Sequence, residues 1–509
     1  MLENLSPLHT RRLTYRPKLP PFLLDASCEK TQSGSPRPEI ARLFPKTAST
    51  PKWKIVSGHG KVRKHLRVGV LFSGGQAAGG HNVLWGLYDG LPDSTLLGFM
   101  NGASGLIDDQ HRLLDRTAIE SVRNQGGFDL IGSGRTKIET EEQFNRVIAC
   151  AQKNDLDAIV VIGGDDSNTN AALLAEKFLA KGLKTCVIGV PKTIDGDLRS
   201  PEIEISFGFD SACRTYSEMI GNIARDALSA KKYTHFIKLM GRSASHITLE
   251  CALQTHPNLA LIGEEGNSLD TIIQTIATLI QKRAEMGKNY GLVLLPEGLV
   301  EFIPEIKELI SALNQKQPLQ GKTQQIFERI PEKVRAQFTL AKDPHGNIAV
   351  SQIETEQLLM SLVNQELQKS NFKAAFHLQE HFFGYEGRAC LPTNFDCTYC
   401  YALGRLVALG IHAGATGVIA AIQGLKQESE KWSGCFIPLV QLMDLEERNG
   451  KLKPVIQKTL VDLRGAPYNH FKKHRDTWAL SDSYRYPGPI QFEGDRIITD
   501  LAPLSISTN

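Results

Sequence analysis

The sequence predicts an α/β protein of two domains whose strands belong to parallel sheets. Its two clearest strand signals, 158–162 and 186–190, are uninterrupted aliphatic runs, as is typical of strands buried on both faces of a parallel sheet. A helix pattern with an apolar stripe separates them, and Ser167 or Asn168 is available as its N-cap. A chain of 509 residues, 41% of them hydrophobic, is long enough for two or three domains.

Both aliphatic runs end in loops that carry carboxylates. The first run stops at Gly-Gly-Asp-Asp (163–166), and the second at Pro-Lys-Thr-Ile-Asp-Gly-Asp (191–197). Ligands bind outside the carboxyl ends of the strands in open parallel sheets, so we expect the two loops to face one crevice. One such loop is often only a strand-to-helix turn. Two of them, adjacent in the chain, favour a functional site.

The residue types in these loops suit phosphoryl transfer to an alcohol. Glycine lets backbone N–H groups approach an anion closely. Asp165 beside a phosphate is best explained as the ligand of a hard cation, for which Mg2+ is the usual choice. Asp195 is then available to accept a proton from an attacking hydroxyl. Lys192 can neutralise charge on the transferring phosphoryl group.

Two further loops after apolar runs carry residues that suit phosphate. The predicted strand 66–72 is followed by the glycine-rich loop 73–80 and then by a helix, which is the arrangement of a phosphate cradle. The loop 132–137 adds two cations, Arg135 and Lys137. Glycine turns and exposed cations are common on their own, and loop 73–80 matches neither GxGxxG nor GxxxxGK[ST].

The second half of the chain repeats the pattern of a strand followed by a polar loop. A long helix from Asp210 is expected to bridge to the second domain. The strand 234–239 leads into Met-Gly-Arg (240–242), and the strand 290–295 leads into Glu297. An arginine at a helix start suits an anionic substrate. The glutamate could hold sugar hydroxyls, with a plain turn as the competing interpretation.

The remaining segments have fewer signals. Residues 1–66 are rich in proline and basic residues, so we expect an extension with short structured pieces at most, lying on a body or a partner, or a solvated tail. Residues 302–370 are predicted to be helical and charged, as an insertion or lid. The segment 384–388 offers an arginine beside a tyrosine. Residues 394–410 are predicted as a helix and 416–422 as a strand.

Composition argues against several kinds of partner. A net charge of +3 without an arginine-rich tract gives no sign of nucleic-acid binding. The start lacks the features of a signal peptide, and the most apolar stretch, 406–422, contains His412 and several glycines, so no membrane span is predicted. The nine cysteines show no framework spacing, although Cys397 and Cys400 form a lone CxxC with a redox or zinc role as a minor alternative. We expect a cytoplasmic protein.

Taken together, the loops resemble the phosphofructokinase family, and specifically its long pyrophosphate-dependent branch. The segments that carry the resemblance occur in family order: 73–75, 163–166, 191–197, 240–242, 296–298 and 385–388. Ala78 departs from the pattern, since the family usually has proline there. The resemblance implies two doubly wound three-layer α/β domains. The diphosphate and Mg2+ domain would be 67–210 plus 393–509, and the fructose 6-phosphate domain 211–392. Outside these cores lie the extension 1–66 and the helical insertion 302–370.

The resemblance also implies a role for individual residues. Asp195 would be the base that deprotonates the sugar 1-hydroxyl, and Asp165 would serve Mg2+. The diphosphate would be bound by Gly74, Gly75, Arg135 and Lys192. Fructose 6-phosphate would be bound by Thr193, Ile194, Asp195, Asp197, Met240, Gly241, Arg242, Glu297, Tyr385, Glu386, Gly387 and Arg388. Lys232 and Tyr233 are similar to residues that the family donates across a subunit interface, so a homodimer or larger assembly with shared active sites is expected.

The expected phosphoryl donor depends on Asp166 and Lys192. ATP-using relatives carry glycine at both positions. Here the carboxylate of Asp166 would occupy the space of an ATP α-phosphate, and a like-charge contact in a partly dry site costs several kcal/mol. Lys192 would compensate by stabilising the diphosphate in the transition state, so both residues are grouped with Asp195 as catalytic. The expected reaction is reversible, Mg2+-dependent transfer from diphosphate to the 1-hydroxyl of fructose 6-phosphate, a step of glycolysis and gluconeogenesis.

Three other functions remain open from the sequence. A non-catalytic regulatory subunit would be expected to have altered acidic loops, whereas these are intact. An ATP-dependent sugar kinase would be indicated by equal rates with both donors. A dinucleotide-binding oxidoreductase is a distant alternative, since the GxGxxG fingerprint is absent.

Overall fold

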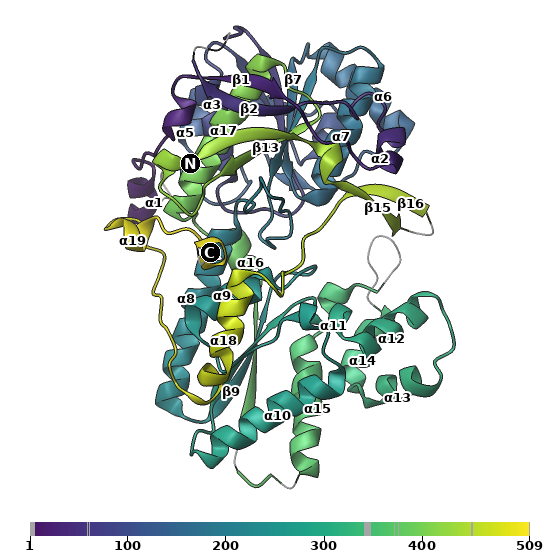
Figure 1. The fold of residues 1–509 in the computed structure, drawn as a ribbon, viewed down its shortest axis with the longest axis vertical. Helices are drawn as coiled ribbons and strands as arrows, with labels where there is room; N and C mark the ends of the chain where they lie inside the picture. Colours follow the sequence, from purple (N-terminus) through teal and green to yellow (C-terminus); the bar gives the residue numbers. More distant parts are fainter. Residues whose placement is uncertain are drawn as a thin grey trace. The chain divides into compact units, whose positions relative to one another are not determined.

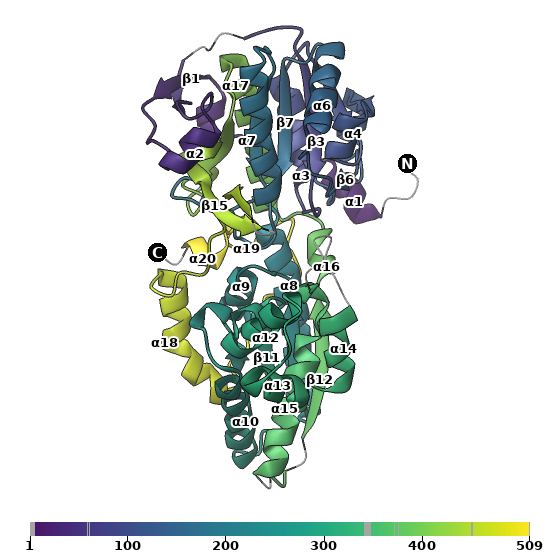
Figure 2. The ribbon, with the colours of Figure 1, turned by 90° about the vertical axis from the view of Figure 1, so that its right-hand side faces the viewer.

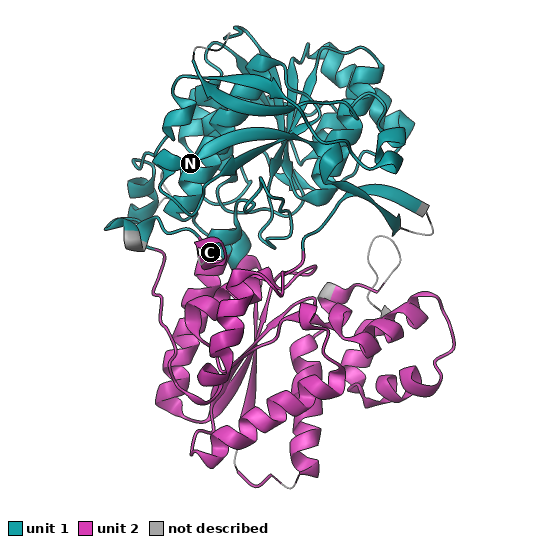
Figure 3. Ribbon diagram, in the orientation of Figure 1, with its two compact units in different colours: residues 1–212, 387–459, 491–502 teal, residues 213–386, 460–490, 503–509 magenta. Residues whose placement is uncertain are grey.

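The computed structural model describes residues 6–58, 60, 62–340, 348–370, 372–374, 376–448 and 451–507. The chain divides into two compact units (Figure 3): unit 1 comprises residues 1–212, 387–459 and 491–502, and unit 2 comprises 213–386, 460–490 and 503–509. The chain passes from unit 1 to unit 2 after residue 212 and returns after residue 386. Both positions lie within six residues of the domain boundaries expected at 210 and 392. Along the part of the chain that is described, no helix combines the length and apolar character needed to cross a membrane.

Unit 1 is built on a ten-stranded sheet whose centre is parallel. In spatial order its strands are β1 (Ala26–Thr31), β2 (Lys52–Ser57), β14 (Ser433–Pro438), β13 (Val418–Gln423), β8 (Cys186–Pro191), β7 (Ala158–Gly163), β3 (Arg67–Ser73), β4 (Thr95–Phe99) and β5 (His111–Leu113), with β6 (Ser133–Gly134) paired to β3. The strands from β13 to β4 run parallel to one another. The strands β14, β2, β1 and β5 are added at the two edges, each by antiparallel pairing. Every residue of β7 and β8 is buried, which confirms the two aliphatic runs as central strands.

Helices cover both faces of this sheet. Ile159 and Val161 of β7 share a hydrophobic cluster with Phe144 of α6 (Glu141–Lys153) and Leu174 of α7 (Asp165–Ala180). Alternate side chains of a strand point to opposite faces, and on the other face α3 (Gly80–Gly90) packs along α17 (Asn394–Ala413). Figure 1 shows α3 and α17 on one side of β7 and α6 and α7 on the other. Unit 1 thus has the three layers that the resemblance implies.

The N-terminal extension is more structured than the sequence suggested. It supplies β1 and β2, and β2 pairs with β14 through the partners Lys54–Cys435 and Trp53–Phe436. The side chain of Arg12 is buried and donates a hydrogen bond to the carbonyl of Asn124 at 3.0 Å. Strands at or next to a sheet edge are held by backbone hydrogen bonds and need no continuous apolar run, so composition did not reveal β1 and β2.

Unit 2 contains a four-stranded parallel sheet in the order β10 (Leu259–Ala260), β11 (Gly291–Pro296), β9 (Tyr233–Leu239) and β12 (His377–Phe383). The long helix predicted from Asp210 is α8 (Phe209–Ala230), which begins in unit 1 and continues into unit 2. Strand β12 was not predicted, because it lies at the edge of the sheet and its side chains are mostly polar and exposed.

The predicted helical insertion is confirmed as helical over its described residues. It forms α12 (Pro304–Asn314), α13 (Gly321–Arg329), α14 (Glu332–Leu340) and α15 (Thr355–Lys369). Its apolar side chains join the cluster that contains Phe236 of β9 and Val293 of β11, among them Ile306, Phe338 and Leu359. The segment is therefore part of the core of unit 2.

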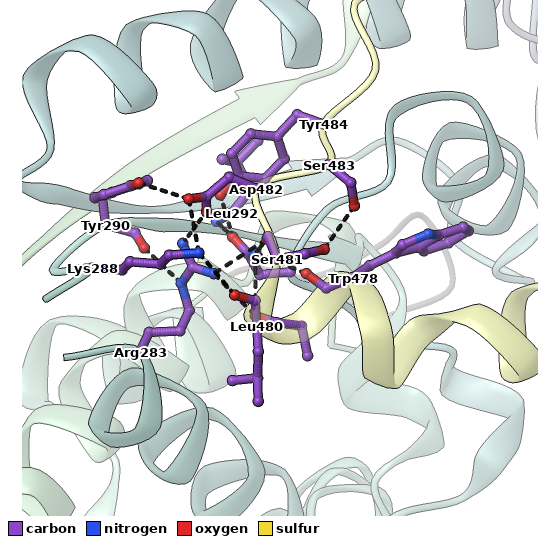
Figure 4. Close-up of polar contacts among 12 residues, drawn as sticks. Arg283, Lys288, Tyr290, Leu292, Trp478, Leu480, Ser481, Asp482, Ser483 and Tyr484 are labelled. Atoms are coloured by element: carbon purple, nitrogen blue, oxygen red, sulfur yellow. Dashed lines mark hydrogen bonds and ion pairs between the residues drawn. The ribbon is translucent and has the colours of Figure 1, made fainter. Parts of the chain in front are cut away.

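The sequence analysis placed the whole C-terminal section, 393–509, in the first domain, and this prediction is wrong in part. The structure instead assigns 460–490 and 503–509 to unit 2. Helix α18 (Ala466–Leu480) runs along α9 (His246–Thr255) and α10 (Leu269–Glu285) (Figure 2) and buries Phe471 and Trp478. Just beyond α18, Asp482 pairs with the buried guanidinium of Arg283 at 2.8 Å (Figure 4). These contacts depend on residues far apart in the sequence.

A pair of histidines in unit 2 should make its stability sensitive to acid. Nδ1 of His235 lies 2.9 Å from Nε2 of His381. Burial, with His381 adding to it, lowers the pKa of His235 from 6.5 to about 4, and burial also lowers the pKa of His381. The unfolded chain therefore binds more protons between these two values, so stability is lost as the pH falls from 6.5 towards 4. We expect His235 to contribute about 2 kcal/mol of destabilisation at pH 5 relative to pH 7.

Urea unfolding at pH 7 and pH 5 measures this effect. His235→Gln should reduce the pH dependence of the free energy of unfolding, while His377→Gln, on the exposed start of the same β12 edge, should leave it unchanged. An unaltered pH dependence in His235→Gln would show that the pair is not the source.

Candidate active site

The carboxyl ends of three neighbouring strands bring the predicted loops of unit 1 together. Strand β3 lies between β4 and β7, and the chain continues from β3 to β4 on one side before β7 is added on the other. This reversal is a topological switch point, where open α/β sheets bind their ligands. The hydroxyls of Ser73, at the end of β3, and Ser167, just after β7, lie 2.9 Å apart. The N–H of Lys192, just after β8, donates to the carbonyl of Gly163, the last residue of β7, at 3.0 Å, so the two acidic loops begin at the same edge of the sheet.

The loop after β7 leads directly into helix α7. The helix begins at Asp165 with Gly164 as its N-cap, so neither Ser167 nor Asn168 caps it as the sequence suggested. Asn168 instead donates from its buried amide to the carbonyls of Gly163 and Gly164, at 2.7 and 2.9 Å. Carboxylates in the first helical turn face the positive end of the helix dipole. Asp165 and Asp166 are therefore held at the sheet edge by the start of α7.

Lys192 connects the loop after β8 with the loop after β3. Its side chain is buried, and its ammonium donates a hydrogen bond to the carbonyl of Gly75 at 2.5 Å. A Cβ atom added to Gly74 would lie 3.6 Å from the same nitrogen. A Cβ at Gly75 would overlap the guanidinium of Arg388, so the arginine side chain lies directly against this glycine. The two glycines and the two cations form one cluster.

The acidic residues of the two loops act electrostatically on the same buried groups. Burial lowers the pKa of Lys192 to about 8; Asp195, Asp165 and Asp197 oppose this change, and Arg388 adds to it. Burial raises the pKa of Asp197, and repulsion from Asp195 and Asp165 adds to the rise. The predicted metal ligand and the predicted base thus act on the same lysine and on the same third carboxylate.

The loop around Asp195 has its own order. The backbone N–H of Asp195 donates to Oγ1 of Thr193 at 3.0 Å, and Gly196 has a φ of 71°, which favours glycine. The side chain of Ile194 is buried in the protein. Its contact with the sugar stays a prediction.

Asp166, the residue after Asp165, forms an ion pair with Lys137. Its carboxylate pairs with the ammonium of Lys137 at 3.0 Å, and about 45% of the Asp166 side chain is exposed. The loop that carries Lys137 is attached to the glycine loop, since the N–H of Gly74 donates to the carbonyl of Gly134 at 2.8 Å. Arg135, the next residue, is exposed. The loop predicted to supply cations thus lies at the site.

A third lysine at the site was missed by the sequence analysis. The ammonium of Lys458 lies 3.7 Å from a carboxylate oxygen of Asp165, and its charge opposes the rise in the pKa of Asp197. Lys458 belongs to the C-terminal section, for which no motif was recognised. No local signal distinguishes it from other surface lysines.

The predicted residues of unit 2 gather at the carboxyl edge of its own sheet. The N–H of Gly241, after β9, donates to the buried carboxylate of Glu297, after β11, at 3.2 Å. The N–H of Met240 donates to the carbonyl of Phe383, the last residue of β12, at 2.9 Å.

Beyond β12, Glu386 accepts a hydrogen bond from the N–H of Gly384 at 2.8 Å. Tyr385 and Arg242 are exposed. Gly387 and Arg388 belong to unit 1, because helix α16 (Tyr385–Arg388) crosses the unit boundary. The guanidinium of Arg388 lies against Gly75 of the glycine loop, and its role in binding the sugar stays a prediction.

Lys232 and Tyr233 are not brought to this edge. Tyr233 is the first residue of β9 and Leu239 the last, so the two ends of the strand are about 20 Å apart. The ammonium of Lys232 lies 5.1 Å from the centre of the Tyr233 ring. Their role in the site of a partner subunit stays a prediction.

The donor set at the edge of unit 1 fits Mg2+. The carboxylate of Asp165, which acts on Asp197 together with Asp195, is a hard oxygen donor of the kind that this ion prefers. Among the described residues, no three histidine, cysteine or acidic side chains form a closed metal cage. A cation held by one or two carboxylates and completed by phosphate oxygens requires no such cage.

Comparisons with known proteins agree with this architecture. The family model described as Phosphofructokinase matches residues 67–411. The chain is 45% identical to the pyrophosphate–fructose 6-phosphate 1-phosphotransferase of Porphyromonas gingivalis, with 98% of each chain covered. It is 49% identical to subunit beta 2 of the enzyme of that name from Arabidopsis thaliana, with 93% of this chain and 88% of the relative covered.

A solved structure has the same fold. The pyrophosphate-dependent phosphofructokinase of Nitrosospira multiformis aligns with a TM-score of 0.56 at 17% identity, covering 86% of this chain and 97% of that one. The matched residues, the full-length relatives and the three-layer architecture lead to one conclusion: this chain belongs to the phosphofructokinase family.

Proposed function

We propose that this protein is a pyrophosphate–fructose 6-phosphate 1-phosphotransferase, which transfers a phosphoryl group reversibly from diphosphate to the 1-hydroxyl of fructose 6-phosphate. The observation that carries the proposal is the cluster at the sheet edge of unit 1, where Asp165, Asp195 and Asp197 all act on the buried Lys192. This reaction needs a base for the hydroxyl proton, a carboxylate that binds a metal ion, and a positively charged side chain beside the transferring phosphoryl group.

In this proposal each residue of unit 1 has a separate task. Asp195 accepts the proton of the sugar hydroxyl as that oxygen attacks phosphorus in line with the leaving phosphate. Lys192 stabilises the charge that develops on the transferring phosphoryl group, and Gly74 and Gly75, which have no side chains, let the diphosphate approach the backbone of their loop. Asp165 would hold Mg2+, which neutralises negative charge on the diphosphate when it is bound.

We assign recognition of the sugar phosphate chiefly to unit 2. Arg242 is exposed and suits the 6-phosphate, and Glu297, oriented by the N–H of Gly241, suits sugar hydroxyls. Tyr385 and Met240 complete the surface from the neighbouring loops. The distance between Tyr233 and this edge supports a role for Lys232 and Tyr233 in a second copy of the chain, so we propose a homo-oligomer with shared active sites.

A cytoplasmic location is also proposed. All nine cysteines are free thiols, which is typical of proteins kept in a reducing compartment. Burial raises the pKa of both Cys397 and Cys400, so these thiols resist ionisation and no redox role is assigned to them.

Phosphorus NMR of the purified chain tests the proposed function. With Mg2+, diphosphate and fructose 6-phosphate, we expect inorganic phosphate and fructose 1,6-bisphosphate to form without any nucleotide or second polypeptide. Replacing diphosphate by ATP should slow the reaction about 100-fold or more, because a like-charge contact at Asp166 costs several kcal/mol. Equal rates with ATP would indicate an ATP-dependent kinase. Turnover only after a second polypeptide is added would indicate a regulatory subunit.

A further inference from the structure

The base proposed for unit 1 lies on a loop, residues 192–207, whose two ends meet. The chain leaves the sheet at Lys192, directly after β8, and Phe207 forms a parallel bridge with this residue. The first half of the loop carries Asp195, and the second half, 198–206, carries none of the residues predicted to be catalytic. Compact loops with adjacent ends are frequently functional. The way in which the second half is held therefore affects where the base lies.

The N-terminal extension holds the second half of this loop. Lys52, the first residue of β2, donates from its ammonium to a carboxylate oxygen of Glu202 at 2.7 Å. About 31% of the Lys52 side chain and 24% of the Glu202 side chain are exposed. Burial acts to raise the pKa of Glu202, but the contacts with Lys52 and Ser200 outweigh it, so this pKa is lowered. Glu202 is therefore ionised at neutral pH, and the ion pair is maintained.

Glu202 belongs to a tight turn with Ser200 and Ile203. The hydroxyl of Ser200 donates to the carboxylate of Glu202 at 3.2 Å, and it accepts from the N–H groups of Glu202 and Ile203 at 3.2 and 3.1 Å. The side chain of Ile203 is buried in the hydrophobic cluster that also contains Val161 of β7. The turn is thus held from two sides, by the core through Ile203 and by the extension through Glu202.

The strand that carries Lys52 belongs to the sheet from which the loop emerges. Strand β2 pairs with β14, β14 pairs with β13, and β13 pairs with β8. The backbone of Lys52 is therefore fixed relative to the end of β8. An ion pair from such a strand can keep the loop in one place, which a contact from a solvated tail could not do.

We propose that Lys52 is a positioning residue for phosphoryl transfer, because its ion pair with Glu202 keeps loop 192–207 in the arrangement that presents Asp195 to the sugar hydroxyl. This inference rests on the proposed function and extends it to the N-terminal extension. The effect of Lys52 is indirect, since the lysine binds the second half of the loop and the first half carries the base. A general base works only at hydrogen-bond distance from its proton, so small displacements of the loop lower kcat.

Initial rates with Mg2+, diphosphate and fructose 6-phosphate test this role. Lys52→Met should lower kcat about 5- to 20-fold, between the effects of an exposed ion pair and of a buried hydrogen bond to a charged group. The KM for fructose 6-phosphate should stay close to the wild-type value, because Arg242 and Glu297 of unit 2 are unaltered. Lys54→Met is the matched control and should leave kcat unchanged, since Lys54 lies on the same strand and pairs with Glu29 of the extension at 3.4 Å.

Reversal of the ion pair separates positioning from a general loss of stability. Glu202→Lys should lower kcat as Lys52→Met does, and the double variant Lys52→Glu/Glu202→Lys should recover most of it. The melting temperatures of Lys52→Met and Lys54→Met should be alike.

The outcomes distinguish two failures. If the wild-type protein turns over diphosphate and Lys52→Met has the same kcat, the role of Lys52 is refuted while the proposed function stands. A fall in kcat that the double variant does not recover, or that accompanies a lower melting temperature, would show a structural role only and would also refute the proposal. If the wild-type protein does not use diphosphate, the proposed function itself fails.

Discussion

Asp195→Asn is expected to lower kcat by about 100- to 10,000-fold, the usual contribution of a general base. Asparagine has almost the same shape, but it cannot accept the proton of the sugar hydroxyl. The hydrogen bond from the N–H of residue 195 to Thr193 uses the backbone and should survive the change. We therefore expect the melting temperature and the affinity for diphosphate to stay close to the wild-type values. Initial rates at saturating substrate measure the effect.

Asp155→Asn is a suitable control for this substitution. Asp155 is an exposed carboxylate in the turn between α6 and β7, on the other end of the strand from the site. Its removal should leave kcat unchanged. Near-normal turnover in Asp195→Asn would mean that another group takes the proton.

Asp166→Gly is expected to raise the rate with ATP by about 100-fold or more. The substitution removes both the side chain and the negative charge from the place assigned to an ATP α-phosphate, where a like-charge contact costs several kcal/mol. A small loss of stability, about 1 kcal/mol, should follow from glycine in the first turn of α7. Parallel rate measurements with ATP and diphosphate show the change in preference.

Lys137→Met distinguishes the charge of Asp166 from its ion pair. This variant loses the 3.0 Å contact with Asp166 but keeps the carboxylate, so ATP should remain a poor donor. An unchanged rate with ATP in Asp166→Gly would show that the exclusion of nucleotides has another cause.

The central strands were predictable because burial on both faces demands an uninterrupted aliphatic run. Strands β7 and β8 satisfy this condition, and so does β11. Strand β2, next to the edge strand β1, and the edge strand β12 are half exposed, and their polar residues hide the pattern. Backbone pairing with a neighbour makes them strands, and that neighbour cannot be identified from the local sequence.

The site could be predicted as far as it follows strand ends. Asp165 and Asp195 come directly after buried strands, so their meeting at one edge is a consequence of parallel topology. Lys458 reaches the same edge through the bond between Thr459 and Asp197, which lie far apart in the sequence. Arg388 likewise lies against Gly75 through tertiary packing. Contacts of this kind leave no local pattern.

The division of labour between Asp165 and Asp195 is the central claim, and Mn2+ binding in the presence of diphosphate tests it most directly. Electron paramagnetic resonance reports free and bound Mn2+, which binds the same oxygen donors as Mg2+. We expect Asp165→Asn to weaken Mn2+ binding at least about tenfold, the lower range for an altered metal site. Asp195→Asn should bind Mn2+ like the wild-type protein although it has lost turnover. Wild-type Mn2+ affinity in Asp165→Asn would contradict the assignment.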